Sequence, residues 1–272
     1  MPHRPIVTLI TDFGAEDHYV GAMKGVILNI NPEVHIVDIC HQVSPYDIFE
    51  AAYALVQSYK YFPGGTIHLV VVDPGVGTAR RPILAAAGPY RFVAPDNGVL
   101  SLLFDREESA QVWHVTADHY FLNPVSNTFQ GRDIFAPIAG WLSKGVELEK
   151  FINPITDYVR LSSPKPRRVN ENLVKGMIIK ADSFGNLITN LSPEDVPELF
   201  TENPPPFKII VNDQEITRLN LAYSLGMPSE LFAIIGSSGY IEISTNRGSA
   251  AKLANANRGT EVGVVIGAAS QS

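Results

Sequence analysis

The chain has 272 residues, 45% of them hydrophobic and 18% charged, enough for one large domain or two ordinary domains with apolar cores. Its formal net charge is −7 and its basic residues run only in pairs, a composition that argues against a nucleic-acid partner. Cys40 is the single cysteine, so no disulfide can form within the chain, and no apolar run approaches the ~18 residues of a membrane span. We therefore expect a cytoplasmic protein with no membrane segment.

Short apolar runs alternate with helical patterns through the first half of the chain. Buried strands are expected at residues 6–11, 34–39 and 66–72, with helices at residues 20–30 and 48–61. This alternation predicts an α/β domain with a mainly parallel sheet. Further strands are expected at residues 82–87 and 90–94, and further helices at residues 98–104 and 133–142.

The pattern changes at SSPKPRRVNEN, residues 162–172, which is polar, contains two prolines and has no apolar periodicity. We interpret it as a linker between a first domain, residues 1–161, and a smaller second domain, residues 173–272. The second domain is expected to contain one short helix at residues 193–200 and a hairpin turn at residues 211–215. Its expected strands are residues 174–181, 207–211, 231–235, 240–244 and 261–266. This pattern predicts a mostly antiparallel β domain.

Polar loops follow three strands of the expected parallel sheet. They are TDFGAED at residues 11–17, CHQVSPYD at residues 40–47 and DPGVGTARR at residues 73–81. Ligands of open α/β sheets bind beyond the carboxyl ends of the strands. The side chains that these loops bring to that edge are Asp12, Asp17, Tyr46, Asp47 and Asp73. We interpret this edge as a binding site.

Other interpretations of the three loops stay open. An aspartate after a strand can form a turn or favour a helix start, as Asp12 and Asp17 would. The segment DPGVGT lacks the spacing and the lysine of a phosphate loop, so its glycines are interpreted as turn formers. Asp12, Asp17 and Asp73 together have the oxygen ligands that suit Mg²⁺. The seven histidines are scattered and do not form a metal-binding pattern.

Three further polar segments interrupt the apolar runs. SNTFQGRDIFAP, residues 126–137, places Gly131 before a helix, where backbone N–H groups lack helical partners. The other two are ADSFGNLITN at residues 181–190 and GSSGYIEISTN at residues 236–246. The carboxamide of Asn186 can pair with the edge of an adenine. Taken singly, each segment is equally well explained by turn residues.

In their order along the chain, these motifs resemble the S-adenosylmethionine (SAM) hydroxide adenosyltransferases, adenosine-forming hydrolases whose family also contains fluorinases and chlorinases. The resemblance extends from TDFG near residue 11 to GYIEISTN near residue 246. It implies an α/β N-terminal domain, a β-barrel-like C-terminal domain and a homotrimer with the ligand between neighbouring subunits. It also implies hydrolysis of SAM to adenosine and methionine, with no cofactor and no bound metal.

The resemblance also implies which residues bind the substrate. In the first domain, Asp12 would bind both ribose hydroxyls and Asp17 would lie near the methionine amino group. In the second domain, Asp182 and Asn186 would form a pair that contacts methionine and adenine. The other implied positions are the aromatic side chains of Tyr46, Phe129 and Tyr223, then Ser237 and Ser238 for the substrate carboxylate, Thr245, Asn246 and Arg247 for the adenine, and Gly131 and Glu242.

Three residues are implied to act on the water nucleophile. Attack at the 5′ carbon expels neutral methionine from a sulfonium, so the enzyme must position the nucleophile rather than protonate a leaving group. Asp73 would accept a proton from the water or orient it, and Arg80 would hold Asp73 by a charge-assisted pair. Arg81 is an alternative partner from sequence alone. Where family hydrolases read TFHGRD, this chain reads TFQGRD, so Gln130 replaces a histidine and can slow turnover.

Three other functions remain as alternatives at this stage. A non-catalytic SAM or adenosine binder is consistent with Gln130. A SAM-dependent halogenase resembles this chain in fold, but halogenases carry tyrosine where Asp73 stands, and a carboxylate there would repel a halide. A magnesium-dependent phosphohydrolase would use the aspartate-rich edge of the first domain.

Overall fold

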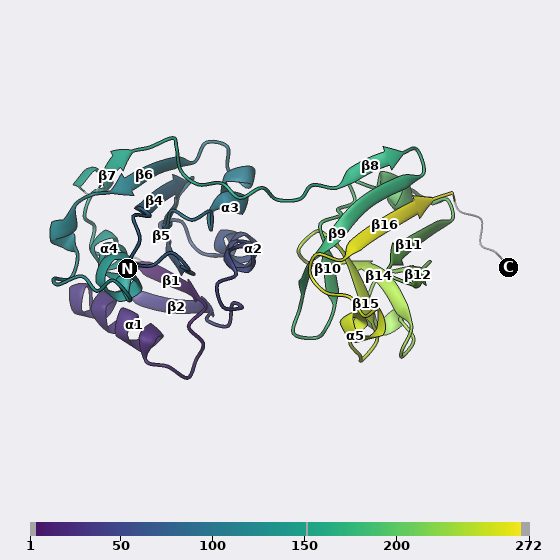
Figure 1. The fold of residues 1–272 in the computed structure, drawn as a ribbon, viewed down its shortest axis with the longest axis horizontal. Helices are drawn as coiled ribbons and strands as arrows, with labels where there is room; N and C mark the ends of the chain where they lie inside the picture. The colour runs from purple at the N-terminus through teal and green to yellow at the C-terminus, as the bar shows by residue number, and fades with distance from the viewer. Residues whose placement is uncertain (1–3, 151, 268–272) are drawn as a thin grey trace. The chain divides into compact units, whose positions relative to one another are not determined.

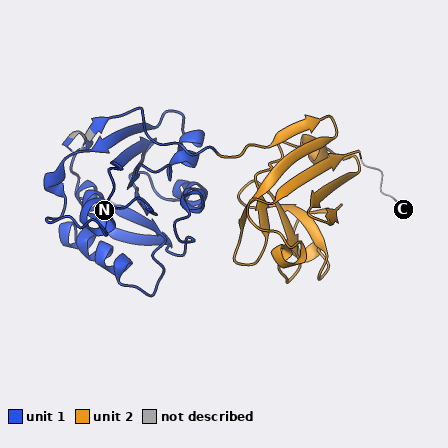
Figure 2. Ribbon diagram, in the orientation of Figure 1, with its two compact units in different colours: residues 1–162 blue, residues 163–272 orange. Residues whose placement is uncertain are grey.

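The computed structural model describes residues 4–150 and 152–267, and the chain divides into two compact units, residues 1–162 and 163–272 (Figures 1 and 2). Each unit has a sheet and a hydrophobic core of its own. Among the described residues, no helix has both the length and the apolar character needed to cross a membrane.

The first unit contains a seven-stranded mixed sheet in the order β2-β1-β3-β5-β4-β6-β7. Its strands are β1 (Ile6–Thr11), β2 (His35–Cys40), β3 (Ile67–Val71), β4 (Pro82–Ala87), β5 (Tyr90–Pro95), β6 (Gln111–Val115) and β7 (Ile152–Pro154). The pairs among β2, β1, β3 and β5 are parallel, whereas β4, β6 and β7 add antiparallel pairs. The expectation of a mainly parallel sheet is confirmed for β2, β1, β3 and β5, and the antiparallel pairs of β4, β6 and β7 make the whole sheet mixed. The two residues between β4 and β5 allow a hairpin but not a parallel crossover.

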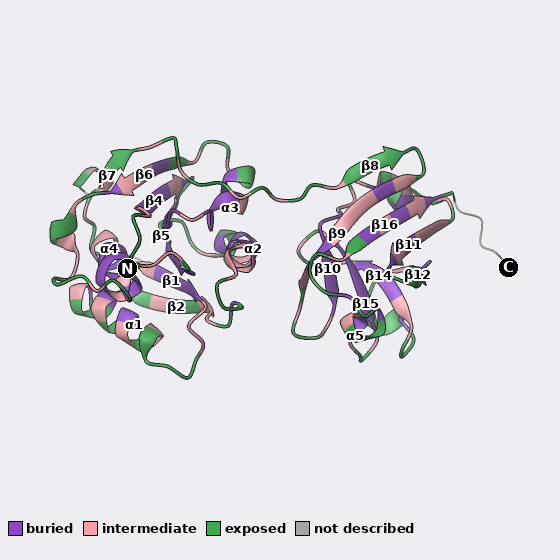
Figure 3. Ribbon diagram, viewed as in Figure 1, coloured by how far each residue is buried: buried purple, intermediate pink, exposed green. Residues whose placement is uncertain are grey.

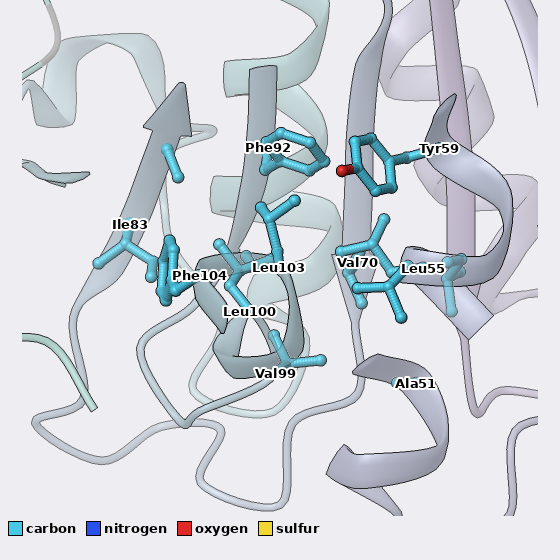
Figure 4. Packing of buried hydrophobic residues seen from close by; sticks show 14 of the residues in the cluster. Ala51, Leu55, Tyr59, Val70, Ile83, Phe92, Val99, Leu100, Leu103 and Phe104 are labelled. Carbon is cyan, nitrogen blue, oxygen red and sulfur yellow. The ribbon is translucent and has the colours of Figure 1, made fainter. Parts of the chain in front are cut away.

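Helices cover both faces of this sheet. They are α1 (Tyr19–Ile30), α2 (Ile48–Ser58), α3 (Ser101–Arg106) and α4 (Ala136–Ser143), with a π-helix, Gly131–Phe135, leading into α4. Successive residues of β3 point to opposite faces. Leu69 packs in the cluster that includes residues of α1 and α4. Val70 packs in the cluster that includes residues of α2 and α3, which Figure 4 shows. Strands buried on both faces read as continuous apolar runs, which is why β1 and β3 are correctly predicted.

The second unit is a nine-stranded sheet with the path β12-β11-β16-β9-β10-β15-β14-β13, to which β8 adds by pairing with β9. The strands are β8 (Arg167–Asn170), β9 (Leu173–Ala181), β10 (Leu187–Thr189), β11 (Phe207–Val211), β12 (Gln214–Ile216), β13 (Leu219–Asn220), β14 (Leu231–Ile235), β15 (Ile241–Thr245) and β16 (Glu261–Ile266). The named pairs are antiparallel except β13–β14, so this unit is also mixed. The path curls, because β12 contacts β14 and both ends contribute to one core.

Two expectations for this part of the chain need correction. Arg167–Asn170, within the segment expected to be a linker, form the exposed strand β8, in which Val169 is the single apolar residue, so no apolar pattern indicated it (Figure 3). The helix expected at residues 193–200 is only a 3-10 turn at Pro197–Phe200. Pro197 disfavours the helical conformation for the residue before it, and Val196 is accordingly non-helical. The hairpin turn is confirmed, with Val211 opposite Gln214 and a left-handed Asn212.

Candidate functional site

The first two loops of the first unit are joined through Asp12. This residue follows β1, and its Oδ2 accepts a hydrogen bond from the backbone N–H of Tyr46 at 2.9 Å. Tyr46 has φ of +67°, and 71% of its surface is exposed. Asp12 thus holds the second loop in a left-handed turn that presents the tyrosine ring outward. Asp17, before α1, is exposed.

A histidine that sequence reasoning did not select supports these loops. His41 Nδ1 lies 2.9 Å from Thr11 Oγ1, its Nε2 lies 2.9 Å from Asp38 Oδ1, and its carbonyl accepts from Gly14 N–H. Burial alone would raise the pKa of Asp38, but hydrogen bonds from Lys24 and His41 lower it overall. The signal in the sequence was weak, because a single histidine in a polar loop has many explanations.

The third loop brings Asp73, Arg80 and Gln130 together. Arg80 Nε donates to Asp73 Oδ1 at 2.8 Å, and Arg80 Nη2 donates to both Asp73 Oδ2 and Gln130 Oε1. The Asp73 and Arg80 side chains are only 5% and 8% exposed. The Arg80 guanidinium also lies 5.1 Å from the centre of the Phe135 ring. A bidentate pair of this kind fixes the carboxylate in position as well as stabilising its charge.

The loop of Asp73 packs closely on the loop of Gln130. Gly77 has φ of +79°, and a Cβ on it would lie 2.4 Å from the carbonyl oxygen of Asn127. Gly77 is therefore required both for the turn and for the approach of the two backbones. Gly131 is the first residue of the π-helix, and a Cβ there would come within 3.3 Å of Val71 and Met23. The loop of Gln130 is thus crowded at two glycines, against Gly77 at Asn127 and at Gly131, the residue that follows Gln130.

The side chain of Phe129 is buried rather than exposed to solvent. It is 7% exposed and makes edge-on contacts with the rings of Phe13, at 6.0 Å, and Tyr19, at 5.1 Å. Tyr19 is itself 38% exposed. The aromatic surface near this loop is therefore shared by three rings, of which the sequence singled out one.

In the second unit, Asp182 organises a tight turn after β9. Its Oδ1 accepts from the backbone N–H groups of Phe184 and Asn186, at 2.9 and 2.8 Å, and its Oδ2 accepts from Asn186 Nδ2 at 2.9 Å. Asn186 is 8% exposed. Since its Nδ2 faces Asp182, the orientation of its amide is determined by the carboxylate.

Glu242 lies on β15 beside this turn. The hydroxyl of Tyr223 donates to Glu242 Oε2 at 2.8 Å. Burial raises the pKa of Glu242 overall, the hydrogen bond from Tyr223 opposes this rise, and the nearby charge of Asp182 adds to it. Burial also raises the pKa of Tyr223 to about 12, with a further contribution from Glu242. A Cβ on Gly236 would lie 1.8 Å from Glu242 Oε1, so a larger residue there would displace the Glu242 carboxylate.

Five of the expected residues of the second unit line one pocket of about 600 Å³. Its lining consists of Asp182, Phe184, Asn186, Tyr223, Thr245, Arg247 and Gly248. Phe184, which is 78% exposed, was not expected from the sequence. Ser237, Ser238 and Asn246 do not line it, and Asn246 Nδ2 instead donates to the carbonyl of Gly226 at 2.8 Å.

The aspartate-rich edge of the first unit does not form a metal centre in the described part of the chain. No group of three or more histidine, cysteine, aspartate or glutamate side chains is arranged there to hold an ion. Asp73 is instead paired with Arg80, and Asp12 accepts a backbone N–H.

Comparisons with known proteins cover nearly the whole chain. The family model of the SAM hydroxide adenosyltransferase N-terminal domain matches residues 7–152, and that of the C-terminal domain matches residues 176–263. A (R)-S-adenosyl-L-methionine hydrolase of Salinispora tropica is 34% identical, with 98% of this chain and 100% of that protein covered. A fluorinase of Nocardia brasiliensis is 27% identical, with 97% and 98% covered. The crystal structure of an uncharacterized conserved protein from Thermotoga maritima is 35% identical, with a TM-score of 0.88 over 96% of this chain and 99% of that one.

Proposed function

The chain belongs to the SAM hydroxide adenosyltransferase family, and on this basis we propose that it hydrolyses S-adenosyl-L-methionine to adenosine and L-methionine. The observation that carries the proposal is the Asp73–Arg80 pair at the end of β3. The reaction needs no cofactor, because SAM is itself the activated substrate.

We propose that Asp73 positions the water nucleophile and accepts its proton. The oxygen of a water molecule forms a bond to the 5′ carbon while the carbon–sulfur bond breaks, and its electron pair returns to sulfur to give neutral methionine. The water loses one proton, which Asp73 can accept, whereas Arg80 stays protonated. Because Arg80 holds both carboxylate oxygens, Asp73 is kept in one orientation toward the nucleophile.

Gln130 takes a different role from a histidine at the same place. Arginine has only donors, so the amide oxygen of Gln130 must face Arg80 and its Nε2 must face away. That NH₂ group can donate to the oxygen of a nucleophile but cannot accept its proton at neutral pH. Gln130 therefore orients the water in our proposal, and Asp73 alone takes the proton.

The remaining positions are proposed to bind the substrate. Asp12 and Tyr46 are suited to the ribose, because the carboxylate has acceptor capacity beyond its one backbone partner. The pocket of the second unit combines the carboxylate of Asp182 with the ring of Tyr223, a suitable lining for a cationic and aromatic ligand.

We further propose a homotrimer with the substrate site at the subunit interface, in the cytoplasm. In the second unit, Leu221, Leu225 and Met227 are 94%, 62% and 61% exposed. Exposed apolar residues gathered in this way are typical of surfaces that contact another chain. Light scattering after size exclusion tests the assembly, and the mass of a monomer at micromolar concentration would contradict it.

The direct test of the function is to incubate metal-free protein with SAM and measure adenosine by chromatography. Adenosine and methionine in equal amounts, independent of added Mg²⁺, are the expected result. Tight adenosine binding without turnover would instead favour a binding protein. A 5′-halogenated nucleoside in the presence of chloride or fluoride would indicate a halogenase, and a requirement for Mg²⁺ would indicate phosphohydrolase chemistry.

A further inference from the structure

We propose that Asp96, Asn97 and Arg81 form a clamp that holds both ends of the loop carrying Asp73 and Arg80, and so act as positioning residues for the reaction. Arg81, directly after Arg80, is hydrogen-bonded to Asp96. Val72, directly before Asp73, is hydrogen-bonded to Asn97. The inference rests on the proposed function only for its kinetic readout.

At the far end of the loop, adjacent arginines have different partners. Arg80 binds Asp73, whereas Arg81 Nε and Nη2 donate to Asp96 Oδ2 at 2.9 and 2.6 Å. The Asp96 side chain is 3% exposed, and the backbone N–H of Asp96 donates to the carbonyl of Arg81 at 2.9 Å. Both the side chain and the backbone of residue 81 are therefore tied to Asp96. This leaves little freedom for the backbone that places Arg80.

At the start of the loop, before Asp73, the chain is held by Asn97, the residue that follows Asp96. Asn97 Nδ2 donates to the carbonyl of Val72 at 2.8 Å, and Val72 directly precedes Asp73. The amide oxygen of Asn97 accepts from Val99 N–H at 3.1 Å, which fixes the orientation of the amide. Two consecutive residues, Asp96 and Asn97, thus hold the chain immediately before Asp73 and immediately after Arg80.

The same turn also receives the last segment of the first unit. Asp96 Oδ1 accepts from Val159 N–H at 2.8 Å, and Arg81 Nη1 donates to Asp157 Oδ1 at 2.9 Å. Gly98 has φ of +94°, and a Cβ on it would lie 2.5 Å from Cγ of Leu161. The clamp is therefore braced by a segment that is remote in sequence from the loop. Loosening it should let the Asp73–Arg80 pair shift, while the substrate-binding residues are untouched.

The test compares two variants of the clamp with a control variant that breaks another ion pair, formed by Arg160 next to Val159. Arg81→Lys and Asn97→Ala each remove one arm, while Asp105→Asn breaks the exposed pair between Arg160 and Asp105, which touches neither arm. Misplacing a reacting group without touching the substrate costs kcat rather than KM. We expect about 10-fold lower kcat for each clamp variant with KM for SAM changed less than about 2-fold, and no change for Asp105→Asn.

A second readout does not depend on activity. The Arg80 Nε–H, assigned by its loss in Arg80→Lys, donates to Asp73, so its exchange with solvent measured by NMR reports the pair directly. Its exchange should be faster in both clamp variants and unchanged in Asp105→Asn. The clamp is refuted if Arg80 Nε–H exchanges at the same rate in all variants, or if Asp105→Asn accelerates it equally. A wild-type chain that forms no adenosine would overturn the proposed function, while the exchange rates would still decide this inference.

Discussion

Two carboxylates of the first unit, Asp73 and Asp96, and two of the second, Asp182 and Glu242, are held in different ways. In the first unit, Asp73 and Asp96 are each paired with an arginine. In the second unit, Asp182 accepts from backbone and amide N–H groups, and Glu242 accepts from a tyrosine hydroxyl. Ion pairs fix a carboxylate rigidly and offset its charge, whereas neutral donors leave its charge for a ligand to meet. We infer that the first unit positions a reacting group and that the second recognises a charged substrate.

The largest effect should follow from removing the charge of Asp73. In Asp73→Asn we expect turnover to fall by about 10²–10⁴-fold, the usual contribution of a general base, while the Kd for adenosine stays near that of the wild type. Adenosine formation measures turnover and isothermal titration measures the Kd. Thermal unfolding measures whether the variant stays folded, because the buried Arg80 loses its charged partner. An equal loss of affinity and turnover would assign Asp73 to recognition and end the contrast between the units.

The next effect concerns stability rather than activity. His68 is fully buried among Tyr59, Tyr90 and Phe92, and burial lowers its pKa to about 3. The unfolded chain, with a histidine pKa near 6.5, therefore binds a proton that the folded unit excludes. Stability should fall as pH drops from 6.5 toward 3, by up to about 1.4 kcal/mol per pH unit.

Urea unfolding followed by tryptophan fluorescence isolates this behaviour. Both tryptophans, Trp113 and Trp141, belong to the first unit. In His68→Gln the dependence of the free energy of unfolding on pH should be weaker between pH 4 and 6.5. An unchanged slope would mean that other groups control the acid response of this unit.

In the second unit, Asn186→Ala should weaken binding rather than turnover. The change removes one donor from Asp182 and one amide from the pocket, and a substrate group left without its hydrogen-bond partner costs about 1–3 kcal/mol of binding free energy. We expect KM for SAM to rise about 10-fold with kcat little changed. A fall in kcat with constant KM would place chemistry in the second unit as well.

The smallest effect is expected from Gln130→His. If Asp73 alone accepts the proton, a histidine at this position should raise kcat by about 10-fold or less and add an inflection to its pH profile near pH 6.5. The wild type should lack that inflection, because glutamine does not titrate. A rise of more than about 10²-fold would show that a base at residue 130, rather than Asp73, limits the rate.

The sequence predicted the elements that depend on local patterns. Residues 6–11 and 82–87 form strands β1 and β4 with the expected bounds, and α1 and α2 begin within one residue of the expected positions. The ordered motifs also predicted the family correctly. The antiparallel pairs of the first sheet were not predicted: β6 and β7 were not among the expected strands, and the short connection between β4 and β5 allows only a hairpin. The roles of the individual substrate-binding residues stay predictions.

The sequence alone named the candidate residues, a few through the loops that end the strands and the others through the family resemblance. What only the tertiary structure decided is which neighbours those residues have. Without the family resemblance Arg80 and Arg81 are equally plausible partners of Asp73, and the structure shows that Arg80 binds Asp73 and Arg81 binds Asp96. Likewise, the contact between Asp12 and the backbone of Tyr46 joins residues that are distant in sequence. The direction of a side chain depends on the backbone angles of its residue and on the segments packed around it, and these segments come together only in the folded chain.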